Sequence, residues 1–321
     1  MQLPVALREA IAARLSGLAA RDLSQSAERL AERYRAPATA AVAPGDDERP
    51  AYLAVRLPAT FAATYAALAE LQARCSGFTP TTVLDLGAGP GTATYAAAEL
   101  WPELGAARLV EQDAAWLRIS RELAAAAYPG LQVEEWQGDL GRTPLGEADL
   151  VVAAYSLTEL PLERALPVLR RAWDAAAGAL VCLEPGTPEG FARIRRYREE
   201  LKAAGAHLAA PCPHQQACPM PAGDWCHFAQ RVERSSLHRY LKSGRLGYED
   251  EKFSYLAAVR GELPPADARI LRRPAIEPGC VTLHLCGPDG LAVVRIPHRD
   301  RQRFKLARKS RWGGPWREPA P

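Results

Sequence analysis

Apolar residues near the start of the chain recur at the spacing of an amphipathic helix: Leu3, Ala6, Leu7, Ile11 and Leu15. A second run over residues 52–75 is rich in alanine and leucine and predicts further helix. Residues 36–50, between the two, are rich in proline, glycine and aspartate and predict a loop. Residues 1–78 therefore predict a helical region, a cap or docking domain that precedes the core.

Residues 79–205 alternate short apolar runs with longer amphipathic ones, which predicts strands followed by helices. The expected strands span residues 82–86, 107–111, 132–137, 148–154 and 179–184. The expected helices span residues 91–101, 114–128 and 191–204. Such alternation is typical of a doubly wound, mainly parallel α/β sheet, which is a Rossmann-like core.

The pattern breaks after this core. Residues 206–274 are rich in proline, cysteine and histidine and only weakly periodic, which predicts an insertion. Residues 281–286 and 291–296 are apolar and flank a Gly-Pro-Asp-Gly turn, so they predict a hairpin. We expect residues 275–298 to complete the core sheet as its terminal β-hairpin and residues 299–321 to form a basic tail.

Composition narrows the class of protein without identifying it. The chain has 321 residues, 48% of them hydrophobic, and a net charge of only +3, which suits a globular protein with a large α/β domain and additions. The positive charge is concentrated, because residues 295–317 hold nine arginines and lysines and only one acid, Asp300. No apolar run is long enough to span a bilayer, so we expect no membrane partner, and nothing indicates an obligate oligomer.

Acids are interleaved with the N-terminal arginines: Glu9, Asp22, Glu28 and Glu32. Mitochondrial import signals are poor in acids, so this region does not look like one. The sequence predicts no secretory signal, and the seven cysteines are an odd number. Metal-bound thiolates in a reducing compartment are therefore the preferred interpretation. We expect a bacterial-type cytoplasmic location.

A glycine-rich loop follows the first expected core strand. Its glycines are Gly87, Gly89 and Gly91, and Asp85 precedes them in the strand. A dinucleotide-binding loop would need a glycine at its sixth position, where Thr92 stands. The spacing is instead typical of the loop that binds S-adenosyl-L-methionine, in which glycines let the backbone approach the amino-acid part of the cofactor. A terminal hairpin also ends the sheet of methyltransferases that use this cofactor.

Two further acids stand where such a cofactor would need them. Glu111 ends the second strand, where a carboxylate can accept hydrogen bonds from both ribose hydroxyls. Asp139 follows the third strand, at the position of an adenine contact. The alternative is a glycine turn in another kind of α/β protein. The candidate cofactor-binding residues are Asp85, Gly87, Gly89, Gly91, Glu111 and Asp139.

Catalysis is a separate question from binding. Methyltransferases that act on base amino groups carry an Asp/Asn-Pro-Pro-aromatic motif after the fourth strand, and residues 154–159 read Ala-Tyr-Ser-Leu-Thr-Glu instead. The pair Pro211-Cys212 resembles the nucleophile of pyrimidine C5 enzymes, but it lies in the expected insertion. No catalytic base is assignable, so an active enzyme and a pocket kept for structure or sensing both stay open.

Four cysteines form a candidate metal-binding set: Cys212, Cys218, Cys226 and Cys286. Zinc sites use cysteines about two to four residues apart, whereas five and then seven residues separate the first three of these. Wider gaps among prolines suit a cubane iron-sulfur cluster, whose thiolates converge from separate loops. In a strand Cys280 and Cys286 would lie about 20 Å apart, so only one can be the fourth ligand, and Cys286 has more room beside the turn.

The alternatives to such a cluster are zinc and ordinary buried cysteines. His214, His227 and His284 could replace a cysteine as ligands, although a lone histidine is more often an ordinary polar residue. If a cluster is bound, the folding of residues 206–274 should depend on it, because ligation is coupled to folding.

Residues 299–317 interleave arginines and lysines with Phe304, Trp312 and Trp316. Cations of this kind neutralise phosphates, and aromatic rings stack on unpaired bases. The segment therefore favours RNA binding over a merely solvated charged face.

Several segments resemble one known family: residues 83–91, Cys212-Pro213-His214, Cys218-Pro219, Asp224-Trp225-Cys226-His227-Phe228, residues 248–255 and residues 307–313. On these segments the chain resembles the methyltransferase-like family associated with the small ribosomal subunit, found in mitochondria and in bacteria. The resemblance implies a [4Fe-4S] cluster held by Cys212, Cys218, Cys226 and Cys286. It also implies association with the immature small subunit and its rRNA during assembly or translation.

Three functional hypotheses follow. The first is an S-adenosylmethionine-binding, iron-sulfur-containing, methyltransferase-like factor that acts on the small ribosomal subunit. The second is an active S-adenosylmethionine-dependent RNA methyltransferase with a structural metal site. The third is a methyltransferase whose cysteines bind zinc.

Overall fold

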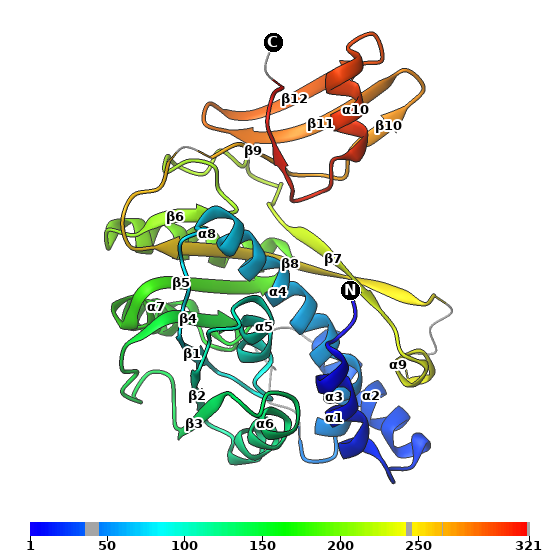
Figure 1. Cartoon of the computed structure of the whole chain (residues 1–321), viewed down its shortest axis with the longest axis vertical. Helices are drawn as coiled ribbons and strands as arrows, with labels where there is room; N and C mark the ends of the chain where they lie inside the picture. The colour runs from blue at the N-terminus through cyan, green and yellow to red at the C-terminus, as the bar shows by residue number, and fades with distance from the viewer. Residues whose placement is uncertain (36–44, 242–245, 265, 320–321) are drawn as a thin grey trace.

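The structure is organised around two β-sheets. The computed structural model describes residues 1–35, 45–241, 246–264 and 266–319. An eight-stranded sheet flanked by helices forms the core, and a five-stranded sheet built from C-terminal strands lies at one end of it (Figure 1).

The core sheet has the strand order β3-β2-β1-β4-β5-β8-β6, with β7 also paired to β8. Strands β1 to β5 run parallel, whereas β8 runs antiparallel to β5, β6 and β7. The first five strands confirm those expected from the sequence, and the fold is the expected doubly wound α/β fold. They span Thr82–Leu86, Ala106–Glu111, Gln132–Gln137, Ala148–Ala154 and Ala176–Pro185.

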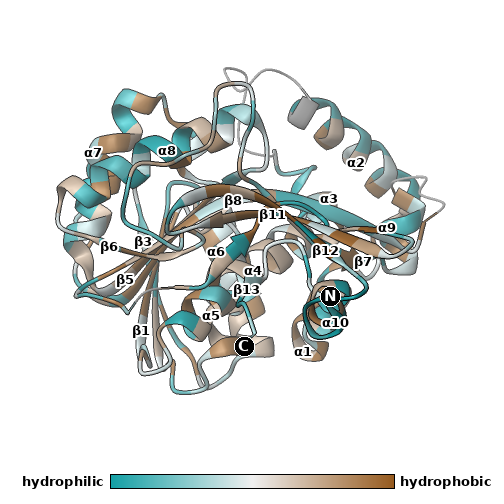
Figure 2. Ribbon diagram, turned by 90° about the horizontal axis from the view of Figure 1, so that it is seen from above, coloured by the Kyte–Doolittle hydropathy of each residue, from teal (hydrophilic) through white to brown (hydrophobic). Residues whose placement is uncertain are grey.

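Helices cover both faces of this sheet, because successive side chains along each strand point to opposite faces. In β1, Val83 belongs to the apolar core under α4, α5 and α6, and Leu84 belongs to the core under α7 and α8. Central strands such as β5 are accordingly among the most hydrophobic segments of the molecule (Figure 2). Of these helices only α7 was not expected; they span Leu57–Arg74, Thr92–Leu100, Ala114–Ala127, Leu162–Ala175 and Pro188–Ala203.

The part of the chain before β1 is helical, as expected. Besides α4 it contains α1 (Val5–Leu15), α2 (Ala20–Arg35) and α3 (Arg49–Val55). The run expected over residues 52–75 is two helices, because the chain turns at Arg56 and a proline occupies the first turn of α4. Residues 36–44 of the expected loop lie outside the described residues. Among the described helices, none is both long and apolar enough to cross a bilayer.

The predicted hairpin forms, but it does not join the core sheet. Strands β11 (Cys280–Gly287) and β12 (Gly290–Pro297) belong to the second sheet, so the expectation that they complete the core is wrong. The positions next to β5 are taken by β8 (Tyr248–Val259) and β6 (His207–Ala210), from the stretch expected to be an insertion. The second half of β8 is an apolar run that is buried on both faces, and it covers the edge of β5.

One face of the second sheet packs against the short helix α10 (Arg301–Lys309). Its strand order is β10-β11-β9-β13, with β12 paired to β11. The remaining strands span Ala268–Ile270 (β9), Ala275–Glu277 (β10) and Pro315–Trp316 (β13). Phe304 and Trp316 are buried in the core between sheet and helix. The expected basic tail is therefore folded, and the expectation that these two rings stack on bases is wrong, because they pack inside the protein.

A two-stranded ribbon connects the core sheet to the N-terminal helices. Strand β7 (Phe228–Glu233) pairs with the first half of β8, and both extend beyond the sheet toward α9 (Ser236–Leu241) (Figure 1). Helix α9 contacts α2 and α3. The ribbon therefore ties the N-terminal helical region to the edge of the core.

We expect Leu283→Ala to lower the free energy of unfolding by about 2–5 kcal/mol, because it removes a fully buried side chain from the core under α10. Thr282→Ala is the matched control. Thr282 is the preceding residue of β11 and its side chain points to the opposite face, so we expect a change below about 1 kcal/mol. Urea denaturation of the full chain measures both, and equal losses would show that this face is not a packed core.

Candidate functional site

The glycine-rich loop lies at the carboxyl end of β1. Gly87, Gly89 and Gly91 all have positive φ angles, which glycine adopts without strain. At Gly87 a side chain is also excluded by space, because a Cβ atom there would lie 2.4 Å from the Cβ atom of Ser156. The loop backbone and the segment after β4 therefore approach each other closely, as a nucleotide-binding loop at this edge of the sheet requires.

The carboxylates of Asp85 and Glu111 lie beside the loop. Glu111 accepts hydrogen bonds from the backbone N–H groups of Gly89 (2.9 Å) and Asp113 (3.0 Å), and burial raises its pKa. Asp85 is buried and accepts hydrogen bonds from the N–H (3.1 Å) and hydroxyl (3.0 Å) of Thr94. Burial raises the pKa of Asp85 to about 6. Glu111 therefore holds the loop at Gly89, and Asp85 anchors the first turn of α5.

Asp139 lies in a turn after β3 and is exposed. Its side chain accepts a hydrogen bond from the N–H of Gly141 (2.8 Å). The structure thus brings the predicted cofactor-binding residues to the carboxyl ends of the neighbouring strands β1, β2 and β3. In open α/β sheets this is the edge where ligands bind.

Helix α3 covers part of this edge. Arg49 forms an ion pair with Asp113, two residues after Glu111, and the ring of Tyr52 meets the ring of Trp116 edge to face, with centroids 5.1 Å apart. The N-terminal helical region therefore contacts the segment that follows β2, close in sequence to Glu111. No local pattern indicates this contact, because it joins residues far apart in the chain.

Two hydroxyls in the segment after β4 are buried without a hydrogen-bond partner among the described residues: those of Tyr155 and Ser156. Ser156 lies against the glycine loop at Gly87, whereas Tyr155 lies near Arg56 and Glu251. Tyr155 also has a φ of 63°, which is unusual for a residue other than glycine. Buried hydroxyls without a partner and an uncommon backbone angle are typical of ligand-binding positions.

The structure brings the four predicted cysteines together around one cavity. Cys212, Cys218 and Cys226 come from the segment between β6 and β7, and Cys286 comes from β11 of the second sheet. The cavity has a volume of about 40 Å³ and is otherwise lined mainly by apolar side chains. Cys280 lies at the opposite end of β11 and is not among the cavity residues. The cysteine site therefore sits where the core and the second sheet meet.

Burial raises the pKa of three of these thiols. The pKa of Cys286 reaches about 12, that of Cys226 is also raised, and in both cases the neighbouring cysteines add to the effect of burial. Burial also raises the pKa of Cys212, and the guanidinium of Arg198 beside it opposes that rise. Four thiolates at this place would repel one another, so they need nearby positive charge.

Two buried arginines line the same cavity. The side chains of Arg198 and Arg269 are only 2% and 8% exposed. The side chain of Arg198 lies beside Cys212, and both arginines lower the pKa of Cys212 and Cys286 against the larger effect of burial. Neither arginine was predicted, because nothing in the local sequence distinguishes them from surface arginines.

The predicted substitute ligands occupy different environments. The Nε2 atom of His214 lies 3.5 Å from the sulfur of Cys286. His227 packs between two tryptophans, with ring centroids 5.2 Å from Trp225 and 5.0 Å from Trp312, and His284 is exposed. In the part of the chain that the structure describes, no three His, Cys, Asp or Glu side chains converge closely enough to hold a single metal ion.

Segments distant in sequence support the cysteine backbone. The hydroxyl of Ser254, in β8, donates to the carbonyl of Cys226 (2.9 Å). Arg269, in β9, donates to the carbonyls of Pro211 (3.1 Å) and Gly313 (2.5 Å). A Cβ atom at Gly313 would lie 2.9 Å from the ring of Phe228, so glycine is needed there. The segments that carry the family resemblance therefore meet at this site.

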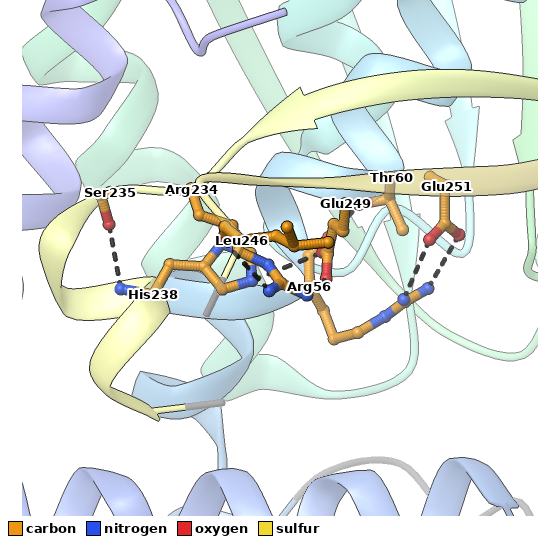
Figure 3. Close-up of polar contacts among 8 residues, drawn as sticks. All are labelled: Arg56, Thr60, Arg234, Ser235, His238, Leu246, Glu249 and Glu251. Atoms are coloured by element: carbon orange, nitrogen blue, oxygen red, sulfur yellow. Dashed lines mark hydrogen bonds and ion pairs between the residues drawn. The ribbon is translucent and has the colours of Figure 1, made fainter. Parts of the chain in front are cut away.

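The acidic stretch at the start of β8 pairs with basic residues on both sides of the ribbon. Glu251 accepts two hydrogen bonds from Arg56 of α4 (3.2 and 3.3 Å), and Glu249 accepts one from Arg234 (2.9 Å) (Figure 3). His238 Nε2 lies 3.4 Å from Glu249. Asp250, between them, points to the other face and pairs with Arg231 (2.9 Å). This stretch fastens the ribbon to α4 and α9.

A family model described as "Mitochondrial small ribosomal subunit Rsm22" matches residues 47–317. The chain belongs to this family. The match includes both sheets and the cysteine site, and it confirms the resemblance drawn from the sequence motifs.

Curated relatives agree with the family. The chain is 31% identical over 285 residues to the human "Ribosome assembly protein METTL17, mitochondrial", covering 82% of this chain and 61% of that protein. It is 27% identical over 317 residues to "Rsm22-cox11 tandem protein 2, mitochondrial" of Schizosaccharomyces pombe, covering 82% of this chain and 42% of that protein. The chain therefore spans less than two thirds of the length of these relatives.

Several solved structures are similar to this chain at low sequence identity. A putative RNA methyltransferase, PH1948 from Pyrococcus horikoshii, has a TM-score of 0.40 and 18% identity, over 60% of this chain and 81% of that one. Magnesium protoporphyrin IX methyltransferase (ChlM) from Synechocystis PCC 6803, with bound SAM, has a TM-score of 0.43 and 14% identity, over 77% and 99% of the two chains. We draw no functional inference from these likenesses.

The relatives correct one expectation. A bacterial-type cytoplasmic location was expected from the acids among the N-terminal arginines. The relatives are named as mitochondrial proteins, and the family description is mitochondrial, so that expectation is contradicted. The acids belong to N-terminal helices, and their presence there does not by itself indicate a cellular location.

We expect Asp85→Asn to change how stability depends on pH. Burial raises the pKa of Asp85 from 3.8 to about 6, so the native state holds the proton more tightly than the unfolded state does. The stabilisation by the protonated form is complete below the unfolded pKa and is lost as the pH rises toward about 6, an effect of about 3 kcal/mol. Denaturation between pH 4 and pH 7 should show this loss in the wild type and little of it in Asp85→Asn; parallel curves would contradict the burial argument.

Proposed function

We propose that this chain is an S-adenosylmethionine-binding, iron-sulfur-containing, methyltransferase-like factor that acts on the small ribosomal subunit. The observation that carries the proposal is the meeting of Cys212, Cys218, Cys226 and Cys286 around one buried cavity in a member of a small-subunit family. The cysteines come from the core side and from the second sheet, so a cluster bound by them would join the two parts of the protein.

The donor set fits a [4Fe-4S] cluster. Such a cluster takes four cysteine thiolates, and it is bulky enough to need ligands arranged around a cavity. The buried arginines Arg198 and Arg269 supply the positive charge that an anionic cluster with four thiolates requires. When bound, the cluster would act as a cross-link between segments and as a redox-sensitive group. Zinc bound by the same cysteines is the alternative, and the content of iron and acid-labile sulfide distinguishes the two.

The loop geometry supports cofactor binding at the edge of the core sheet. We assign the glycine loop to the amino-acid part of S-adenosylmethionine, Asp85 to its ammonium group and Glu111 to the ribose hydroxyls. Asp139 is assigned to the adenine amino group. Because Glu111 already accepts the N–H of Gly89, its position for the ribose is set before the cofactor arrives.

The ribosomal partner rests on the family and on the relatives. The family description names the mitochondrial small ribosomal subunit, and the human relative is named a ribosome assembly protein. We propose the small subunit and its rRNA as the partner of this chain, during assembly or translation.

A second candidate is methyl transfer to RNA. It is favoured by the buried hydroxyls of Tyr155 and Ser156 after β4, which have no hydrogen-bond partner among the described residues. The hydroxyl of Ser156 lies next to the loop at Gly87. Incubation with labelled S-adenosylmethionine and immature small subunits tests it. Label in the RNA, lost when Ser156→Ala and Tyr155→Phe are combined, would support the enzyme; no label with saturating cofactor would reject it.

We expect Cys226→Ser to lose most bound iron and acid-labile sulfide, whereas Cys280→Ser should retain the wild-type content. Cys226 lines the cavity, and Cys280 does not. The measurement is iron and sulfide per chain after anaerobic purification. Zinc without sulfide in the wild type would reject the cluster in favour of the zinc alternative, and equal iron loss in both variants would reject the ligand assignment.

We expect Glu111→Ala to weaken binding of S-adenosylmethionine by about 10- to 100-fold, because a charged hydrogen-bond acceptor is worth about 1.5–3 kcal/mol. Glu147→Ala is the control, since this exposed carboxylate lies just before the amino end of β4, away from the loop. Isothermal titration calorimetry measures both. Equal affinities for wild type and Glu111→Ala would remove the ribose assignment.

We expect the wild type to sediment with small ribosomal subunits at low salt. Cell extract separated on a density gradient and probed for the protein measures this, with large-subunit fractions as the internal control. Absence from the small-subunit fractions would count against the ribosomal role.

A further inference from the structure

Helix α10 has two faces of opposite character. Phe304 and Ala307 are buried against the second sheet, and Asp300 caps the start of the helix by accepting the N–H of Arg303. The other face is basic and carries Arg301, Lys305, Arg308 and Lys309, which we call the α10 basic face. The packed side fixes the orientation of the helix, so the cations are held on the outside of a folded unit.

The cations of the α10 basic face form no ion pair among the described residues, whereas their basic neighbours do. Arg303 pairs with Asp300 (3.2 Å) and Glu318 (2.8 Å), and Arg317 pairs with Asp267 (3.0 Å). Arg303 and Arg317 thus stabilise the fold of the C-terminal region. The charges of the α10 basic face are not compensated by ion pairs and are available to a partner.

The surface at this face is concave. A hollow of about 500 Å³ is lined by the four cations together with His298 and Phe304. Residues one helical turn apart are separated by about 5–6 Å along the axis, so Arg301, Lys305 and Lys309 form a row of charges along one side of α10. A linear polyanion with regularly spaced charges matches such a row.

Aromatic stacking does not contribute at this surface. Phe304 is 9% exposed and packs edge to face against His298, with centroids 5.0 Å apart, and Trp316 is 4% exposed. Trp312 packs against His227 at the cysteine site. The partner is therefore contacted through charge and not through its bases, which is how proteins bind a phosphate backbone without reading its sequence.

We propose that the α10 basic face binds the sugar-phosphate backbone of RNA, without base specificity. The choice of RNA over other polyanions rests on the proposed small-subunit function. Each cation that neutralises a phosphate releases a counterion, so affinity falls steeply with salt. With about −0.7 per phosphate for a single strand, four contacts contribute about −2.8 to the slope of log affinity against log salt, or about a 50-fold loss between 50 and 200 mM.

The test uses the full-length protein purified without oxygen and a fluorescein-labelled single-stranded RNA oligonucleotide of mixed sequence. The variant replaces the α10 basic face by glutamine, with Arg301→Gln, Lys305→Gln, Arg308→Gln and Lys309→Gln combined. We expect the salt slope to fall by about 3 and affinity at low salt to fall by at least tenfold, equally for unrelated sequences.

The control variant removes the same net charge elsewhere. It combines four exposed arginines for which the described residues offer no ion pair: Arg21→Gln, Arg118→Gln, Arg142→Gln and Arg164→Gln. Its slope of log RNA affinity against log salt should be nearly that of the wild type. Such a result would show that binding depends on the α10 basic face and not on the overall charge of the protein. Circular dichroism melting of both variants checks that the second sheet stays folded.

An unchanged salt slope in the α10 variant would overturn the proposal. Displacement of the RNA by equal concentrations of polyglutamate would also overturn it, in favour of an acidic protein partner.

The proposed ribosomal function and the proposed RNA-binding surface can be rejected independently of each other. If the wild type sediments with small subunits but the α10 variant binds RNA normally, the RNA surface is elsewhere and the ribosomal role stands. If the wild type binds RNA through α10 but stays out of small-subunit fractions, the ribosomal role fails and the surface stands.

Discussion

Arg269 lies in the interior where the core sheet, the cysteine-bearing segment and the C-terminal residues meet. A buried guanidinium must be paired and hydrogen-bonded, because an uncompensated charge inside a protein costs several kcal/mol. Arg269 meets this requirement with partners from three parts of the chain: the carboxylate of Glu70 in α4 and the carbonyls of Pro211 and Gly313. The cysteine site, the second sheet and the core can satisfy this arginine only when all three are assembled.

The same constraint explains the character of the cysteine site. Burial and the neighbouring cysteines raise the pKa of Cys226 and Cys286, so four ionised sulfurs would be unstable in an apolar cavity on their own. Arg198 and Arg269 offset part of that cost, and a cationic iron core would offset the rest. The two arginines and the iron core would together compensate the negative charge of the four thiolates. Neither the cations nor the thiolates would be stable in this cavity alone.

The elements that depend on a local sequence pattern could be predicted. The placement of an element at a sheet edge could not, because it depends on which edge is free in the folded protein. Strands β1 to β5 were predictable because alternating apolar runs and helices leave one arrangement. The hairpin was found but misplaced, since only the three-dimensional sheet shows that β8 already covers β5. The cysteines could be grouped from their motifs, whereas Arg198 and Arg269 could not, because burial of an arginine leaves no local mark. The roles of Phe304 and Trp316 were predicted wrongly, because an aromatic residue buried in a core and one exposed for stacking on bases look the same in the sequence.

The chain order links the α10 basic face to the cysteine site. Helix α10 ends at Lys309, and within four residues Trp312 packs on His227 and Gly313 accepts a hydrogen bond from Arg269. So short a connection leaves little freedom between the end of the helix and the segment that holds Cys226. At its other end the second sheet supplies Cys286 to the same cavity. A group bound by the four cysteines would therefore fix the second sheet from both sides. It would also fix the direction of the α10 basic face relative to the candidate cofactor site at the edge of the core. Because the proposed RNA contact depends on charge and not on bases, any selectivity for one site on an RNA must come from the rigid placement of this surface and not from its chemistry.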